Sequence, residues 1–233
     1  MDIPAPIVLV GGDEFRPECE SMDRALLNLR VEGRPRVVIL PTAAAGQRPE
    51  LAASNGIRHF ESLGARAEAA MVVDKTSAND RGVLQPLMSA GLIYLAGGNP
   101  SRLLQILRAT DLWAAIRTSW AAGSVLAGSS AGAMVLGEWM FAPGDPPTWV
   151  KTVAAAPRIA VLPHFDRWSV ERRDQAMSTK PLGITLLGIP GASGIVLGSE
   201  GGLVRVVGER SITIVTADGE ESIVDPGVDF VLA

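Results

Sequence analysis

The chain has 233 residues, enough for one α/β domain over residues 1–233, with 47% hydrophobic residues, 5% aromatic residues and a formal net charge of −4 at pH 7. The mild charge gives no support for nucleic-acid or membrane partners, and the single Cys19 excludes an internal disulfide and a cysteine-rich metal site. Without a leader pattern or an apolar run of about 18 residues, we expect a cytoplasmic protein that needs no metal or cofactor.

Short apolar runs alternate with longer amphipathic segments in the first half of the chain. Continuous apolar strands separated by helix-length segments are typical of a parallel sheet that is covered on both faces. In the second half, short β-rich runs are separated by Gly, Pro or Asp-Gly turns. The pattern predicts an open, mostly parallel sheet with helices on both faces and extra antiparallel strands toward the C-terminus. The predicted parallel strands are residues 6–10, 36–40, 69–73, 92–98 and 124–128.

Four glycine-rich or polar turns directly follow predicted strands. Because ligands bind beyond the carboxyl ends of the strands in such sheets, these turns are expected to meet around one cleft. The turns are residues 11–15, 41–47, 97–101 and 128–132. The first spells Gly-Gly-Asp-Glu-Phe, the name of a cyclase signature. It follows the first strand directly, where no such nucleotide-binding scaffold precedes it, and we interpret Asp13 and Glu14 as a turn at the sheet edge.

The stretch Gly128-Ser129-Ser130-Ala131-Gly132 fits the Gly-x-Ser-x-Gly nucleophile elbow, in which the middle serine is Ser130. A serine in a strained strand-to-helix turn needs small neighbours, and the amides of the following helix can stabilise an oxyanion. A tight turn built only of small residues would give the same pattern. The motif alone does not decide between them.

A serine nucleophile needs a base, and the chain has two histidines. His59 lies in a helix-like stretch with charged neighbours and is expected at the surface. His164 directly follows an apolar strand and Pro163, and it comes after Ser130 in the chain, as in elbow enzymes. His164 is therefore the candidate base, with a hydrogen-bonded structural histidine as the alternative.

A second glycine turn, Gly97-Gly98-Asn99, precedes a predicted helix. Its glycines expose backbone amides and allow a substrate carbonyl to approach, so Gly98 and Asn99 are candidate substrate-binding residues. An oxyanion hole made by the amides of Gly98 and Ala131 is the favoured interpretation. The alternative is a tight turn in which Asn99 caps the helix.

These motifs together resemble the family of serine peptidases that contains dipeptidase E and cyanophycinase. The resemblance is carried by Gly11-Gly12, VVILPTAAAG (residues 37–46), YLAGGNPSRLL (94–104), GSSAGAMVLG (128–137) and LPHFDRW (162–168). It implies a fold like that of class I glutamine amidotransferases. It also implies peptide hydrolysis through an acyl-enzyme on Ser130, with His164 as general base.

Two segments depart from the family pattern. AAAPRIAVLPH stands where many relatives have a Gly-Leu-Gly stretch, and LGIPGASGIV stands where many have an acidic Gly-Ile-Asp-Glu turn. We expect the hydrolytic machinery to be retained and a small peptide to be the substrate. The sequence leaves open the residue preferred at the cleaved bond, and whether the protein forms a homodimer.

Three acids near the motifs could orient His164 as the third member of a triad. Asp145 lies fifteen residues after Ser130 in a Gly-Pro-rich loop, a spacing similar to that in dipeptidase E, and is the first choice. Glu138 is the second, expected about two helical turns along the elbow helix. Asp166 would have to reach back along its strand, and a surface role for Asp145 stays open.

Two other functions are weighed against the peptidase. An α/β-hydrolase esterase is disfavoured because the chain lacks a lipase-like His-Gly-Gly-Gly motif and the expected order of acid and late histidine. A family member that binds a peptide or metabolite without turnover is disfavoured because Ser130, His164 and the Gly-Gly-Asn turn are all present.

Overall fold

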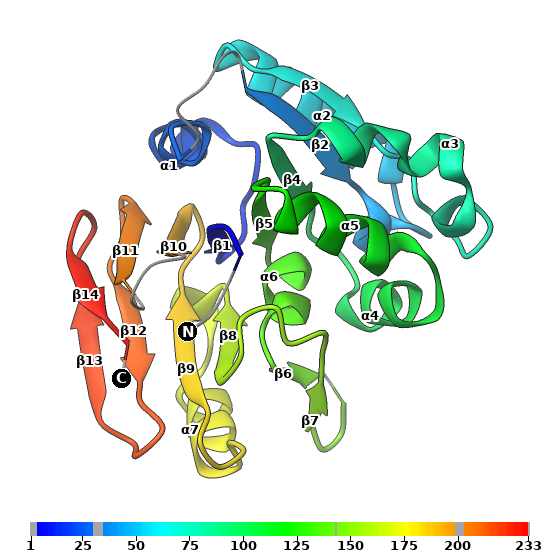
Figure 1. Ribbon diagram of the computed structural model, residues 1–233. Coiled ribbons are helices and arrows are strands. Elements are labelled where there is room, and N and C mark those ends of the chain that lie inside the picture. The colour runs from blue at the N-terminus through cyan, green and yellow to red at the C-terminus, as the bar shows by residue number, and fades with distance from the viewer. Residues whose placement is uncertain (1–3, 30–34, 143, 199–202, 233) are drawn as a thin grey trace.

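Two β-sheets with helices between and around them organise the chain (Figure 1). The computed structural model describes residues 4–29, 35–142, 144–198 and 203–232. The helices are α1 (Glu20–Leu27), α2 (Pro49–Ser62), α3 (Arg81–Leu84), α4 (Pro100–Ala109), α5 (Leu112–Ala121), α6 (Ala131–Leu136) and α7 (Val170–Ser178). Among the described residues, no helix is both long and apolar enough to cross a membrane.

The larger sheet has eight strands in the order β14-β11-β10-β1-β5-β4-β2-β3. Its strands β1, β5, β4, β2 and β3 are mutually parallel, and β10, β11 and β14 extend it in antiparallel fashion. The predicted fold class, a mostly parallel α/β sheet with antiparallel strands added late in the chain, is confirmed. The strands are β1 (Ile7–Val10), β2 (Arg36–Leu40), β3 (Arg66–Ala69), β4 (Leu92–Leu95), β5 (Val125–Ser129), β10 (Ser193–Leu197), β11 (Leu203–Gly208) and β14 (Asp229–Val231).

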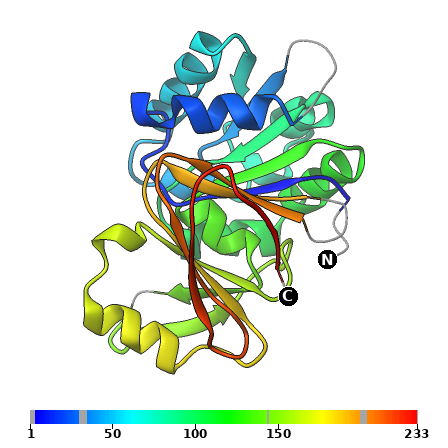
Figure 2. The same cartoon turned by 90° about the vertical axis from the view of Figure 1, so that its left-hand side faces the viewer.

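The smaller sheet has six strands in the order β13-β12-β9-β8-β6-β7, and its existence as a separate sheet was not predicted. Strands β6, β8 and β9 are parallel, and the others are antiparallel to their neighbours. After β9 in the smaller sheet, the chain passes to β10 and β11 in the larger sheet, returns to β12 and β13 in the smaller one, and then forms β14 in the larger sheet (Figure 2). The strands are β6 (Trp139–Ala142), β7 (Thr148–Lys151), β8 (Ile159–Pro163), β9 (Thr185–Ile189), β12 (Ile212–Val215) and β13 (Glu221–Val224).

The third predicted strand, residues 69–73, is misplaced. The strand is Arg66–Ala69, at the edge of the larger sheet, where it pairs with β2. An edge strand is not buried on both sides, so β3 carries Arg66 and Glu68 instead of an apolar run. Glu68 accepts a hydrogen bond of 2.8 Å from Nε of Arg36 on β2.

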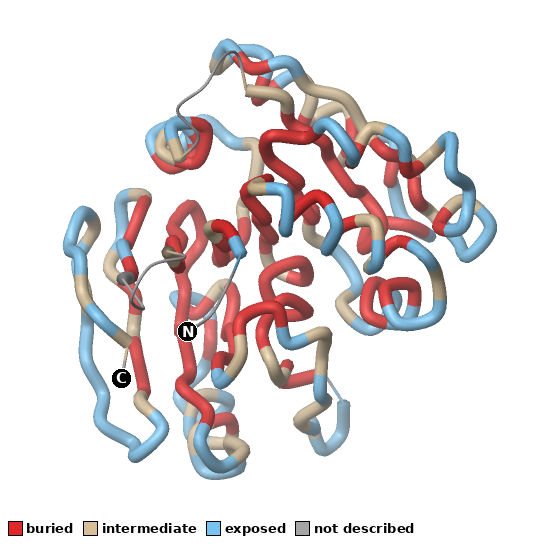
Figure 3. The backbone as a smooth tube through the Cα atoms, viewed as in Figure 1, coloured by how far each residue is buried: buried red, intermediate tan, exposed pale blue. Residues whose placement is uncertain are grey.

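Helix α6 lies between the two sheets and is buried at every residue (Figures 1 and 3). It contacts β1, β4 and β5 of the larger sheet and β6 and β8 of the smaller one. A helix that is apolar on all sides is one without a solvent face. A Cβ on Gly132 would lie 2.2 Å from the carbonyl oxygen of Leu95. Close packing therefore accounts for the small residues that begin this helix.

Helices α1 and α2 cover the opposite face of the larger sheet, and between them lies a buried hydrogen bond between a histidine and an aspartate. Nε2 of His59 is 2.7 Å from Oδ2 of Asp23, and the two side chains are 7% and 0% exposed. The prediction that His59 lies at the surface is wrong, because its side of α2 packs toward Phe15 and Phe60. Burial raises the pKa of the Asp23 carboxyl, and the hydrogen bond with His59 opposes that rise.

Candidate active site

Ser130 occupies the sharp turn between β5 and α6. Its φ of 48° and ψ of −106° are unusual for a residue with a side chain, and its amide donates to the carbonyl oxygen of Val10 at 2.9 Å. The preceding Ser129 is fully buried, and its Oγ donates to Oε2 of Glu14 at 2.8 Å. Of the two adjacent serines, Ser129 therefore belongs to a buried hydrogen-bond network, and Ser130 occupies the elbow position.

His164 follows the last residue of β8 and faces Ser130 across the gap between the sheets. Its Nε2 is 3.2 Å from Oγ of Ser130. The backbone of His164 is left-handed, with φ of 50°, and its amide donates to the carbonyl oxygen of Gly11 at 2.9 Å. A Cβ on Gly12 would lie 2.1 Å from Cε1 of the imidazole, so only glycine leaves room for the ring at this end of β1.

The other side of the imidazole faces a cation. Nη1 of Arg167 is 3.4 Å from Nδ1 of His164, and Nη2 of the same guanidinium donates to Oδ2 of Asp13. The Asp13 carboxylate raises the pKa of the Arg167 guanidinium. Asp13 was interpreted only as a turn residue. The signal that could have found it is its place directly after β1, at the same strand edge as the other candidate residues.

Asp145 and Glu138 are not brought to His164 by the described contacts. Asp145 is exposed on the loop between β6 and β7, and no hydrogen bond or ion pair of the described residues joins it to His164. Its role as the triad acid stays a prediction. The expected place of Glu138 is wrong, because α6 ends at Leu136, and Oε2 of Glu138 instead accepts a hydrogen bond from the amide of Arg158 at 2.8 Å.

Asp166 is occupied by other partners. Its Oδ1 accepts from the amide of Gly191 at 3.2 Å, and its Oδ2 accepts from Nη1 of Arg210 at 2.9 Å. Oδ2 is also 3.8 Å from Nε of Arg167. These contacts turn the carboxylate away from the imidazole and toward the β9–β10 connection.

The Gly97-Gly98-Asn99 turn packs closely against the residues after β2. Gly98 has φ of 142°, and a Cβ there would lie 2.3 Å from the carbonyl oxygen of Ala43. Oδ1 of Asn99 accepts from the amide of Arg102 at 3.0 Å, so the side chain of Asn99 caps α4, as the alternative interpretation proposed. The amide of Gly97 donates to Oε1 of Glu14 at 2.7 Å.

The two amides predicted to bind an oxyanion are unengaged in the described part of the chain. Among the described residues, the amide of Gly98 donates no hydrogen bond. Ala131 is the first residue of α6, where a backbone N–H has no carbonyl partner within its own helix. Both groups therefore remain free to donate, and their joint role stays a prediction.

A cavity of about 240 Å³ opens beside Ser130 and His164. Its wall is largely apolar and carries two cations, with the guanidinium of Arg172 lying 3.9 Å from the centre of the Trp168 ring. Such a site suits a side chain that combines an apolar stem with a polar or anionic end. The lining residues are Pro100, Ser130, Met134, Phe141, Val161, Leu162, Pro163, His164, Arg167, Trp168 and Arg172.

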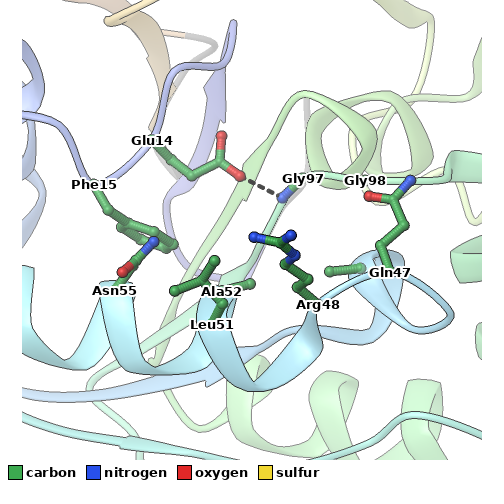
Figure 4. A pocket seen from close by; sticks show the side chains of 10 residues that line it. Glu14, Phe15, Gln47, Arg48, Leu51, Ala52, Asn55, Gly97 and Gly98 are labelled. Atoms are coloured by element: carbon green, nitrogen blue, oxygen red, sulfur yellow. Dashed lines mark hydrogen bonds between the residues drawn. The ribbon is translucent and has the colours of Figure 1, made fainter.

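A second cavity, of about 500 Å³, lies on the other side of the glycine turn and is more polar (Figure 4). Figure 4 shows Arg48 extending from the start of α2 toward the carboxylate of Glu14. Gly97 and Gly98 line this cavity, and Pro100 lines the first. Together, the glycine turn and the residue that follows Asn99 therefore contribute to the walls of both cavities.

Comparisons with known proteins agree with one another. The sequence model of peptidase family S51 matches residues 7–197 of the chain. A cyanophycinase of Trichormus variabilis is 28% identical over 222 residues, covering 90% of this chain and 72% of the relative. A cyanophycinase of Synechococcus elongatus is 34% identical over 170 residues, covering 67% of this chain and 51% of that protein.

Solved structures show the same similarity in three dimensions. The crystal structure of a peptidase from an acI-B1 Actinobacterium has a TM-score of 0.86 and 26% identity, covering 97% of this chain and 96% of the other. A putative peptidase E of Listeria monocytogenes has a TM-score of 0.61 and 19% identity, covering 88% of this chain and 98% of that chain. The second similarity concerns the fold alone.

Proposed function

The chain belongs to peptidase family S51 and is a peptidase, and from that premise we propose that it hydrolyses short peptides by nucleophilic attack of Ser130. The observation that carries the proposal is the 3.2 Å contact between Oγ of Ser130 and Nε2 of His164. The strained elbow at Ser130 and the left-handed backbone at His164 support it, because strain of this kind is retained mainly at functional sites.

In the proposed reaction, Nε2 of His164 takes the proton from Oγ of Ser130 as the oxygen attacks the carbonyl carbon of the peptide bond. The tetrahedral oxyanion accepts hydrogen bonds from the amides of Gly98 and Ala131. The C–N bond breaks as His164 returns the proton to the leaving amine, which leaves an acyl ester on Ser130. Water, deprotonated by the same histidine, hydrolyses the ester and regenerates the enzyme.

The cavity beside Ser130 supports a short substrate. A volume of about 240 Å³ accommodates one side chain of the acyl group, and Arg167 and Arg172 on its wall favour an acidic residue there. Substrate preference is therefore proposed as acidic on the acyl side of the cleaved bond. A cytoplasmic location remains an expectation from composition.

The proposal is tested with a panel of dipeptides and tripeptides and with a fluorophosphonate probe. We expect turnover of short peptides, fastest with Asp or Glu on the acyl side, and covalent labelling of the wild-type protein that is absent in Ser130→Ala. Casein serves as the control, because a folded or long chain should not fit the site. Cleavage of casein at the rate of the best dipeptide, or labelling that survives in Ser130→Ala, would contradict the proposal.

A further inference from the structure

The partner of His164 at Nδ1 does not suit a general base. A guanidinium carries only donors, so Nδ1 facing Arg167 must act as the acceptor. A neutral imidazole in that state carries its hydrogen on Nε2 and donates it to Ser130. Taking a proton from Ser130 requires the other tautomer, with the hydrogen on Nδ1 and an acceptor in front of it. With Arg167 at Nδ1, His164 is therefore in the wrong tautomer to accept the proton of Ser130. A nearby carboxylate that accepted a hydrogen bond from Nδ1 would favour the tautomer that can.

Asp13 is the carboxylate on this side of the ring. It directly follows Gly12, whose Cα lies against the imidazole. One guanidinium bridges the two groups, with Nη1 at Nδ1 of His164 and Nη2 at Oδ2 of Asp13. The Asp13 carboxylate is thus separated from Nδ1 by the width of a single side-chain group.

The backbone of Asp13 is fixed from several directions. Sγ of Cys19 donates to its carbonyl oxygen at 3.1 Å, and the carbonyl oxygen of the preceding Gly12 accepts from the amide of Ala192 at 3.0 Å. A Cβ on Gly191 would lie 2.1 Å from Oδ2 of Asp13, so the carboxylate fills the space that a side chain at position 191 would take. Such a fixed carboxylate is suited to orient a neighbouring ring.

The exposure of the two partners differs. The side chain of Asp13 is 15% exposed and that of Arg167 is 55% exposed. Arg167 can therefore move into the cavity it lines, or into solvent, without breaking buried packing, whereas Asp13 stays in place. Asp166, the other acid near Arg167, already holds the Gly191 amide and Arg210.

We propose that Asp13 is the positioning carboxylate of His164, and that Arg167 is an exchangeable bridge between them. This inference rests on the function proposed above. When Arg167 withdraws, the imidazole carries its hydrogen on Nδ1 and donates it to Oδ2 of Asp13, which frees the Nε2 lone pair. The proton of Ser130 then moves to Nε2, and the imidazolium is stabilised by the Asp13 anion until the leaving amine takes that proton.

The decisive experiment compares two variants that break the same ion pair. Asp13→Asn leaves the Arg167 cation uncompensated beside the imidazole. We expect kcat to fall by about 10³–10⁴, as in other triads that lose the orienting carboxylate, and the acidic limb of the pH profile of kcat/KM to move to lower pH. Arg167→Met removes the cation and keeps the carboxylate. Because Arg167 also lines the substrate cavity, we expect KM for acidic peptides to rise in this variant. With a peptide that is uncharged on the acyl side, we expect the acidic limb of the kcat/KM profile to move to higher pH.

The opposite movement of the two profiles separates positioning from structure, because a purely structural ion pair would give the same response in both variants. The charged groups around the imidazole are Asp13 from the turn after β1, Arg167 and Asp166 from the turn after β8, Arg172 from α7, and Arg210 behind Asp166. Asp174→Asn, at an exposed position of α7, is the control for loss of a carboxylate charge. Asp145→Asn is measured beside it as the competing acid.

A wild-type protein that turns over no peptide, or a Ser130→Ala variant that stays active, refutes the proposed function and this inference with it. With the wild type active and Ser130→Ala inactive, three results overturn the role of Asp13 alone. They are wild-type kcat in Asp13→Asn, pH profiles that move in the same direction, and an inactive Asp145→Asn beside an active Asp13→Asn. If Asp13→Asn melts below the assay temperature, Arg167→Met decides, and an acidic limb that does not move to higher pH in that variant overturns the proposal.

Discussion

Ser130→Ala is expected to lower the turnover of the best peptide by roughly 10⁴–10⁶, as removal of the nucleophile does in other serine hydrolases. Alanine occupies no more space than serine in the elbow, so the fold should be retained. The measurement is kcat/KM together with the melting temperature of the purified variant. The size of the effect follows from the role proposed for Oγ, which forms the covalent bond to the acyl group.

Ser129→Ala is the matched control, one residue away and of the same chemistry. It removes the hydrogen bond from the buried Ser129 to the half-buried Glu14 carboxylate, which we expect to cost about 1–3 kcal/mol of stability. Turnover should fall far less than in Ser130→Ala. Equal losses of turnover in the two variants would show that the wrong serine has been chosen.

His59→Ala is expected to lower the free energy of unfolding by about 3–5 kcal/mol near neutral pH, because it leaves the buried Asp23 carboxylate without its partner. Among the described residues, Oδ1 of Asp23 has no hydrogen-bond partner even in the intact pair. Urea unfolding followed by circular dichroism measures the change. The double variant Asp23→Asn/His59→Ala, which removes the charge as well, should regain part of the loss. No gain in the double variant would contradict this origin.

The pH dependence of that loss follows from the raised pKa of Asp23. Burial raises this pKa above its ordinary value, and removing His59 takes away the interaction that lowers it. A carboxyl with a raised pKa in the folded state favours folding in its protonated form, and that contribution is lost as the pH rises through the raised pKa. The difference between His59→Ala and the wild type should therefore shrink as the pH falls through this range.

The parts of the fold that the sequence predicted are those set by local burial. Strands β1, β2, β4 and β5 lie inside the larger sheet and read as apolar runs, so their positions were predicted to within a few residues. The edge strand β3 has no such run and was misplaced. The division of the later strands between two sheets was not predicted, because strand sequences do not record which neighbour each one pairs with.

In the candidate site too, residues with a local sequence signal were predicted, and contacts between residues far apart in the sequence were not. Ser130 and His164 were chosen from turn chemistry next to strands, and their 3.2 Å contact joins the ends of two different sheets. The bridge from Asp13 to Arg167 spans 154 positions of the chain, and neither residue lies in a motif that specifies a partner. His59 was misplaced because its charged neighbours along the helix hid the one face that packs inward.

Because α6 is buried between the sheets, its packing has a consequence for the proposed reaction. Ser130 follows β5 of the larger sheet and His164 follows β8 of the smaller one, so the distance between their side chains depends on the packing of α6 as well as on the hydrogen bond from the His164 amide to the carbonyl oxygen of Gly11. Ala133 and Val135 touch no substrate in the proposed reaction, yet an added methyl group at either would push the sheets apart. In the proposed reaction, side chains that never touch the substrate would thus affect the rate through the spacing of Ser130 and His164.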